Sequence, residues 1–262
     1  MVLTMLRDHA EELGATASPE SFTAAIEATR AQLANDSARL EVVDVRRAGG
    51  RLEFDVRITN LTGHKLPSAH PTRRVWLHAE LRSEAGETLF ASGRFDERGR
   101  VLGTDGLPLA SEAAGGPVQP HRDRIEDGDQ VALYRGVMAD IDGNSTHLLL
   151  RGASYLVDDR LLPRGWRDDG PDAERTAPAG FEDDDFLGGS DVVTYSVELP
   201  AVAAGGLVIE LELLHQSLSA RWAAEILASE GPAIRRFEAL YAAGNPRPNS
   251  LGRIAYELRQ AR

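Results

Sequence analysis

Apolar and polar residues alternate with a period of two through the middle of the chain. The clearest case is the stretch 52–58, where the apolar residues are separated by charged or polar ones. Successive side chains of a strand point to opposite faces, so this pattern predicts a strand with one buried face and one exposed face. Similar patterning predicts further strands at 40–45, 75–82, 88–92, 130–138, 146–157, 191–199 and 206–215.

The apolar spacing becomes helical towards both ends of the chain. We predict helices over 2–13 and 18–34, and the second begins with the residues Ser-Pro-Glu at 18–20. Serine caps a helix, proline fits its first position, and an acid favours its first turn. Helical spacing returns after Leu218, and we expect a short terminal helix over 249–260.

These patterns together predict a mainly β protein. Antiparallel strands with meandering connections and helices at both ends are typical of a β-sandwich, of an Ig-like or jelly-roll-like kind. We expect an N-terminal helical segment over 1–36, a sandwich domain with long loops over 37–216, and a C-terminal helical segment over 217–262 that packs on the sandwich or on a partner. The connections at 96–128 and 158–190 have the length of functional or disordered loops.

The composition excludes several classes of function. The chain has 262 residues, a formal net charge of −12 and no cysteine. An acidic balance argues against nucleic acid or an anionic membrane as the main partner, because both require a basic surface. Without cysteine the chain has no disulfide, no thiolate metal site and no C-x-x-C-H haem attachment. We find no signal peptide pattern at the start and no apolar run long enough for a membrane span.

The connection over 60–78 contains the most concentrated set of candidate functional residues. It includes three histidines, His64, His70 and His78, between two predicted strands. Neutral imidazole is a metal ligand, but this spacing matches no compact metal motif, and we expect no metal bound by this chain alone. His78 falls on the polar face of a predicted strand and is expected to be exposed. His64 follows Gly63, which allows unusual backbone angles; iron ligation and structural anchoring of the loop both remain open for it.

Charged residues give three further candidate sites, each with a simpler alternative. Arg73 and Arg74 can bind an anion such as a carboxylate, or can form salt bridges with acidic residues of the chain. Asp140, Asp142 and Asn144 resemble the first half of a calcium loop, but the closing glutamate is missing and Asp-Gly is also a common hairpin turn. The acidic run 182–185, with Asp191 nearby, can hold a cation or form a solvated loop.

The sequence gives little support for catalysis by the chain on its own. It contains no G-x-S-x-G nucleophile motif, no phosphate-binding loop and no dinucleotide fingerprint. We therefore predict no catalytic residues.

Several ordered motifs resemble one known family. The run Thr62-Gly63-His64-Lys65 with the Arg pair and Trp76 is similar to a segment of the C-terminal, post-haem region of bacterial multihaem c-type cytochromes. Further stretches resemble that region in the same order, with His215 where a tyrosine is expected. They are Met5–Ala10, Pro120–Tyr134, Leu161–Trp166, Asp185–Tyr195 and Leu213–Ala223.

The resemblance implies a role in electron transfer without haem on this chain. Haem c would belong to a missing domain or a partner subunit, and the protein would be periplasmic or extracellular. The chain would be a non-catalytic accessory module that covers haems, with His64 as a possible distal ligand and Arg73 and Arg74 as propionate contacts. Two alternatives stay open: a calcium- or carbohydrate-binding module that uses the acidic loops and Trp166, and a hydrolase built on the His64 loop.

Overall fold

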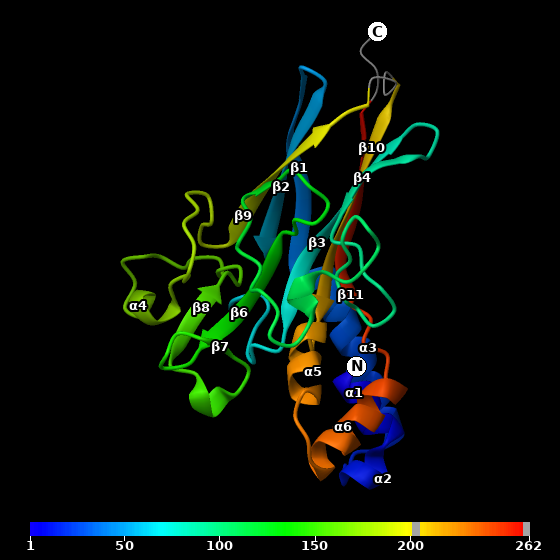
Figure 1. Cartoon of the computed structure of the whole chain (residues 1–262), viewed down its shortest axis with the longest axis vertical. Coiled ribbons are helices and arrows are strands. Elements are labelled where there is room, and N and C mark those ends of the chain that lie inside the picture. The colour runs from blue at the N-terminus through cyan, green and yellow to red at the C-terminus, as the bar shows by residue number, and fades with distance from the viewer. Residues whose placement is uncertain (201–204, 259–262) are drawn as a thin grey trace.

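The computed structural model describes residues 1–200 and 205–258, and its architecture is mainly β (Figure 1). A four-stranded sheet has the order β1-β2-β9-β5, and a seven-stranded sheet contains β11-β10-β3-β6-β7, with β4 paired to β3 and β8 paired to β6. Neighbouring strands are antiparallel except β5 and β9. The strands are β1 (Ala38–Ala48), β2 (Arg51–Asn60), β3 (Arg74–Ser83), β4 (Thr88–Ser92), β5 (Arg124–Ile125), β6 (Leu133–Ala139), β7 (Ser145–Thr146), β8 (Ser154–Asp158), β9 (Ser190–Glu198), β10 (Leu207–Gln216) and β11 (Asn249–Leu258).

The main core lies between the two sheets. The predicted apolar face of β2 is fully buried, and it shares one cluster with the alternate residues of β3 and β10. Phe54 stacks on Tyr195 of β9, with ring centroids 5.0 Å apart. The predicted alternation and the predicted sandwich of antiparallel strands with helices at both ends are therefore confirmed.

The outer face of β3 is also covered, which the alternation did not indicate. Trp76 on this face is fully buried in a second cluster with Val101 and Leu214, and its Nε1 donates to the carbonyl of Gly93 at 3.0 Å. The long connection after β4 supplies this cover. As a result His78 is half-buried, and the prediction that it is exposed was wrong.

Helices α1, α2, α3, α5 and α6 gather at one end of the molecule, whereas α4 lies apart from them near β8 (Figure 1). Ser18 caps α3 as predicted, because its Oγ accepts the backbone N–H of Ser21 at 3.2 Å. Met1 and Met5 pack against a cluster that contains Trp222 and Tyr241, so both ends of the chain share a small core. The helices are α1 (Val2–Asp8), α2 (Ala10–Leu13), α3 (Pro19–Asp36), α4 (Ala173–Thr176), α5 (Ala220–Leu227) and α6 (Pro232–Ala243), with 3₁₀ turns η1 (Ala110–Glu112) and η2 (Leu149–Arg151).

The end of the described chain is a strand, so the prediction of a helix over 249–260 was wrong. Residues Asn249–Leu258 form β11, which pairs antiparallel with β10, and Leu251 is fully buried. Residues 259 and 260 lie outside the described residues. The free edge of β10 offers a full ladder of backbone hydrogen bonds, and this tertiary pairing outweighs the local helical pattern. The C-terminal segment thus contains two helices and a strand of the larger sheet.

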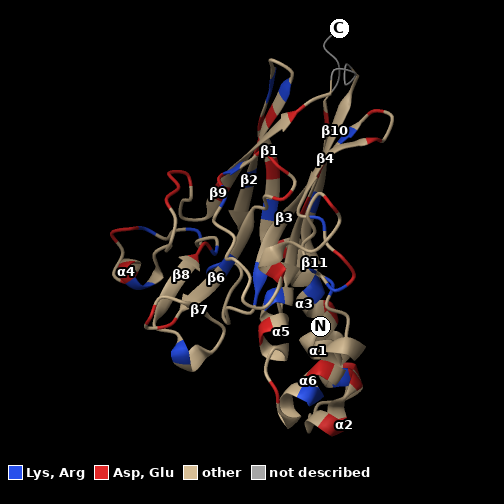
Figure 2. Ribbon diagram, in the orientation of Figure 1, with Lys and Arg blue, Asp and Glu red and all other residues tan. Residues whose placement is uncertain are grey.

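Charged residues of both signs are distributed along the loops and helices. Figure 2 shows basic and acidic residues interspersed along the ribbon in this view. Within the part of the chain that the structure describes, no helix is long and apolar enough to cross a membrane.

Candidate functional site

The loop between β2 and β3 is held at its base by one buried side chain. The Asn60 amide nitrogen lies 2.8 Å from the His64 carbonyl and 3.1 Å from the Leu162 carbonyl, and its Oδ1 accepts the Thr62 backbone N–H at 2.9 Å. Asn60 is fully buried. These contacts fix the start of the loop against the segment that follows β8.

Lys65 and Leu66 attach the same loop to the neighbouring segment. Lys65 Nζ donates to Asp158 Oδ2 at 2.7 Å, and Leu66 forms an isolated antiparallel bridge with Leu161. The Asp158 carboxylate also accepts from Arg160 Nε at 2.6 Å. Burial raises the pKa of Asp158, but these two cations outweigh it and lower that pKa. Gly63 does not use left-handed backbone; in this loop that conformation occurs at Ala69, with φ 62°.

His64 is exposed near the start of this anchored loop, and its hydrogen bonds indicate the tautomer of its ring. Nδ1 lies 2.9 Å from the Lys65 carbonyl and 3.2 Å from Thr62 Oγ1. A carbonyl oxygen only accepts, so Nδ1 carries the hydrogen and the lone pair of the neutral ring lies on Nε2. Among the described residues, Nε2 has no hydrogen-bond partner.

The other two histidines of the connection are arranged differently. His70 Nδ1 accepts the Thr72 backbone N–H at 3.3 Å, so its neutral ring carries the hydrogen on Nε2. Burial, and then the charge of Arg73, lower the pKa of His70. His78 Nε2 lies 3.6 Å from Glu80 Oε1, and burial lowers the pKa of His78. Among the described residues, two groups of three side chains bring their possible metal-ligand atoms close together. Neither group includes His64, His70 or His78.

The two arginines after the loop have different environments. Arg74 is buried and forms a bidentate pair with Glu112, with Nη1–Oε1 at 2.6 Å and Nη2–Oε2 at 2.9 Å. Its Nε also donates to Gln216 Oε1 at 2.9 Å. Arg73 is half-buried and donates to Ser68 Oγ at 3.2 Å; within the described ranges it has no carboxylate partner. The salt-bridge alternative therefore describes Arg74 and not Arg73.

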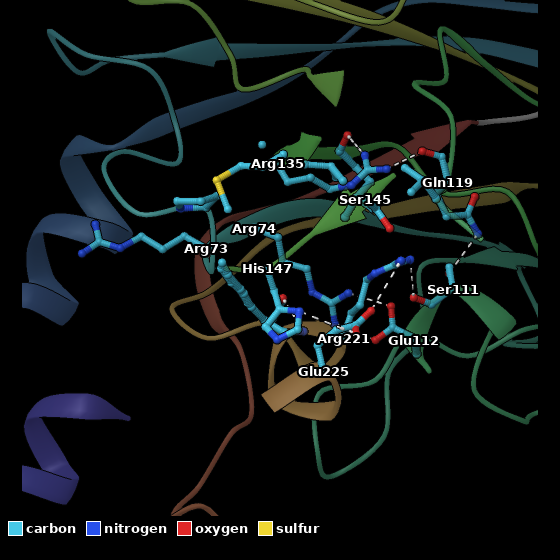
Figure 3. Close-up of a pocket in the computed structure, with 18 of the residues that line it drawn as sticks. Arg73, Arg74, Ser111, Glu112, Gln119, Arg135, Ser145, His147, Arg221 and Glu225 are labelled. Atoms are coloured by element: carbon cyan, nitrogen blue, oxygen red, sulfur yellow. Dashed lines mark hydrogen bonds and ion pairs between the residues drawn. The ribbon is translucent and has the colours of Figure 1, made fainter. Parts of the chain in front are cut away.

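Arg73 and Arg74 also line a pocket between β6, β7 and α5 that the sequence did not predict (Figure 3). The pocket encloses about 720 Å³ of empty space, part of it open to solvent. In Figure 3 the Arg73 side chain extends away from the Arg74–Glu112 pair. The other lining arginines have partners: Arg135 pairs with Asp159 at 2.9 Å, and Arg221 donates to the Pro117 carbonyl at 2.8 Å.

Trp222 and His147 give the pocket an aromatic part of its lining. Trp222 is almost fully buried, and two histidine rings meet it edge-on, His70 at 5.1 Å and His147 at 6.0 Å between centroids. Its Nε1 is buried and has no hydrogen-bond partner. The end of the His64 loop therefore adjoins the pocket, because Pro71 and Arg73 line it and His70 contacts its Trp222.

The two predicted acidic sites differ in burial. Asp140 Oδ1 accepts the backbone N–H groups of Asp142 at 3.0 Å and Asn144 at 2.9 Å, in the turn between β6 and β7. In the run 182–185, by contrast, the Asp183 side chain is only 2% exposed and accepts from His121 Nε2 at 2.9 Å. Glu182 and Asp184 are exposed, as the solvated-loop interpretation expects, whereas the Asp183 side chain is buried and Asp185, although exposed, lies in a cluster with Asp123 and Asp183.

The two alternatives to the cytochrome interpretation, a carbohydrate-binding module and a hydrolase, depend on Trp166 and His64. Trp166 is half-buried against the main core and donates from Nε1 to Thr176 Oγ1 at 2.9 Å, so only part of its ring is open to solvent. The hydrogen-bond partners of the His64 ring are Thr62 and Lys65. Among the described residues no carboxylate orients this ring, as a hydrolase triad would require.

Comparison with known proteins gives one structural match. No family model matches the sequence, and no curated protein matches it. The fold is similar to the crystal structure of a penta-haem cytochrome c552 from Thermochromatium tepidum, with 15% identity and a TM-score of 0.49. The match covers 87% of this chain and 41% of that one, so this chain spans less than half the length of its structural neighbour. At this similarity a common function does not follow, and function has to be argued from the site.

Proposed function

We propose that this chain is a non-catalytic accessory module of a multihaem cytochrome electron-transfer system. In this proposal His64 provides one axial ligand to a haem iron carried by another domain or subunit. The observation that carries the proposal is the His64 ring: Nδ1 is engaged by the Lys65 carbonyl at 2.9 Å, and Nε2 is exposed with its lone pair available.

The geometry fits a histidine that binds a metal from outside the chain. Ligating histidines usually donate their second ring N–H to a carbonyl or carboxylate, which fixes the tautomer and raises the basicity of the ligating nitrogen. Asn60, Lys65 and Leu66 hold the loop on both sides before any partner arrives. A preorganised loop loses little conformational freedom on binding, so more of the interaction energy contributes to affinity.

Arg73 supports the same proposal. Haem propionates are carboxylates, and a guanidinium binds a carboxylate through two parallel hydrogen bonds. Arg73 lies at the end of the same connection and has no carboxylate partner in the described part of the chain, whereas Arg74 is already paired with Glu112. We therefore assign the propionate contact to Arg73 alone.

The haem would supply the electron transfer, and this chain would tune it. An axial imidazole and the exclusion of water are two of the means by which a protein sets a haem potential. The chain itself then needs no nucleophile and no general base. Its role would be periplasmic or extracellular, as for other c-type haem systems.

A short haem c peptide tests the axial-ligand proposal directly. The peptide should carry its own histidine on one side of the ferric iron and leave the other axial position open. Titration with the wild-type chain should convert the haem to the low-spin form, seen as a shift of the Soret band. His64→Ala should weaken this binding at least about tenfold, the range for loss of a metal-site contact.

His70→Ala is the matched control, because His70 is also exposed on the same loop but carries its ring hydrogen on Nε2. This variant should bind like the wild type. Equal binding by His64→Ala and wild type would remove the proposal. For Arg73, the variant Arg73→Gln should weaken binding of the peptide with free propionates, and should have no effect when the propionates are esterified.

A further inference from the structure

Two parts of the chain that are distant in the sequence meet beside the start of β9. His121 comes from the long connection before β5, Asp183 from the acidic run, and Asp191 from β9 itself. One ligand atom from each side chain lies within 4.8 Å of the other two. The ligand atoms around a single tetrahedral metal ion are spaced by roughly 3–4 Å, so modest movements would bring this set to one ion.

Asp191 gives the independent indication of a ligand. It is fully buried, and its Oδ2 accepts the Tyr134 hydroxyl at 2.6 Å. Its Oδ1 is also buried but has no hydrogen-bond partner, whereas His121 Nδ1 lies 3.6 Å from Asp159 Oδ2. An orphaned carboxylate oxygen in the interior is costly, and a bound ion is one of the few ways to satisfy it.

A second acidic group lies on the solvent side of the first. Carboxylate oxygens of Asp123, Asp183 and Asp185 also lie within 4.8 Å of one another, and Asp183 belongs to both groups. Carboxylates this close repel one another, and a cation bound between them would relieve that repulsion.

We propose that His121, Asp183 and Asp191 form a binding site for a divalent transition-metal ion, and that this ion is Zn²⁺. One imidazole and two carboxylates match the ligand preferences of Zn²⁺, whereas Ca²⁺ would prefer oxygen ligands alone. The ion would take the position between His121 Nε2 and Asp183 Oδ2, which are now 2.9 Å apart. The exposed residues Asp123 and Asp185 give the ion an acidic route from solvent.

Groups around the three ligands hold them in place. Phe181 stacks on the His121 ring at 4.0 Å, and Phe186 meets it edge-on at 5.5 Å. Asp183 Oδ1 accepts the backbone N–H of Asp185 at 2.9 Å and of Phe186 at 3.2 Å. Such supporting contacts are typical of metal sites and orient the ligands before the ion binds. This site is separate from the His64 loop, and its test needs no haem.

Calorimetric titration of the chelator-treated chain with Zn²⁺ tests the site. The His64→Ala background removes the exposed histidine whose Nε2 lone pair has no partner among the described residues. We expect one ion per chain, with affinity reduced at least about tenfold by Asp191→Asn and by His121→Gln. Asp184→Asn, an exposed acid of the same run, should bind like the background. Zn²⁺ should also raise the Tm of the background chain, because an ion that binds only the native state stabilises it, and should not raise the Tm of Asp191→Asn.

Three results would overturn the proposal. The first is the absence of Zn²⁺ binding, and the second is binding that is unchanged in both Asp191→Asn and His121→Gln. The third is a site that prefers Ca²⁺ and is lost in Asp123→Asn but not in His121→Gln, because it would be an oxygen-only site on the surface. If Asp191→Asn or His121→Gln does not fold, Asp183→Asn provides the same comparison.

Discussion

Phe54 shows at the scale of one residue what holds the sandwich together. Its ring is fully buried between the sheets and stacks on Tyr195 at 5.0 Å. Phe54→Ala should lower the free energy of unfolding by roughly 3–5 kcal/mol, because it removes apolar contact and leaves a cavity. Denaturant unfolding measures this, with Val43→Ala on β1 as an exposed control. A loss below about 1 kcal/mol would contradict the assigned burial.

His215 gives the molecule a sensitivity to acid. Burial lowers the pKa of this residue to about 4, and the charge of Arg73 adds to the effect. In the unfolded chain the pKa is about 6.5, so between pH 6.5 and pH 4 the unfolded state binds a proton that the native state does not. The contribution to stability is full above pH 6.5 and decreases as the pH falls towards 4.

His215→Phe should therefore change the pH dependence of stability. Between pH 7 and pH 4.5 the wild type should lose about 2–3 kcal/mol more unfolding free energy than the variant. Denaturant unfolding of both proteins at the two pH values measures the difference, and any pH-independent cost of the substitution cancels. Parallel pH profiles would show that His215 is protonated in the native state.

At the scale of elements, the sequence predicted structure wherever one local pattern decided it. The strand at 52–58 and the start of α3 at Ser18 were found because alternation and capping are local signals. The strand β11 was missed because its conformation depends on the free edge of β10, which is some 30 residues or more away in the chain. The cover over Trp76 was missed for the same reason.

The candidate sites, too, were predicted from the sequence only where a local signal identified their residues. His64 was identified from its motif, but the tautomer that makes it a ligand depends on a hydrogen bond to Lys65 that spacing does not reveal. The pairing of Arg74 with Glu112 and of His121 with Asp183 joins residues from separate parts of the chain. For the second pair, the only local signals were the histidine in the motif over Pro120–Tyr134 and the separate acidic run 182–185.

The N-terminal helices should exchange their amide hydrogens faster than the sheet. In α1 and α2 no residue is buried, and in α3 only Ile26 is. Few buried contacts mean that local opening costs little free energy. Hydrogen exchange should therefore show low protection over residues 2–36 and high protection in β2, which is paired on both sides with β1 and β9. Equal protection in both regions would show that the helices unfold only with the whole molecule.

At the scale of the whole molecule, the proposed role requires that haem be shared with a partner. The chain has no cysteine for covalent attachment. His64 is exposed on a loop and does not lie at the base of an enclosing cavity. One axial ligand without a surrounding apolar pocket gives weak binding, because most of the apolar surface of a porphyrin then stays in water.

The purified chain should therefore be colourless, and added haemin should dissociate from it during gel filtration. Absorbance at the Soret band across the eluted protein peak measures this. The haem c peptide should still titrate onto the chain at equilibrium, because ligation by His64 requires only an open axial position and not a cavity. A Soret band that elutes with the wild-type chain, and equally with His64→Ala, would mean that the chain encloses a haem elsewhere and that His64 is not its ligand.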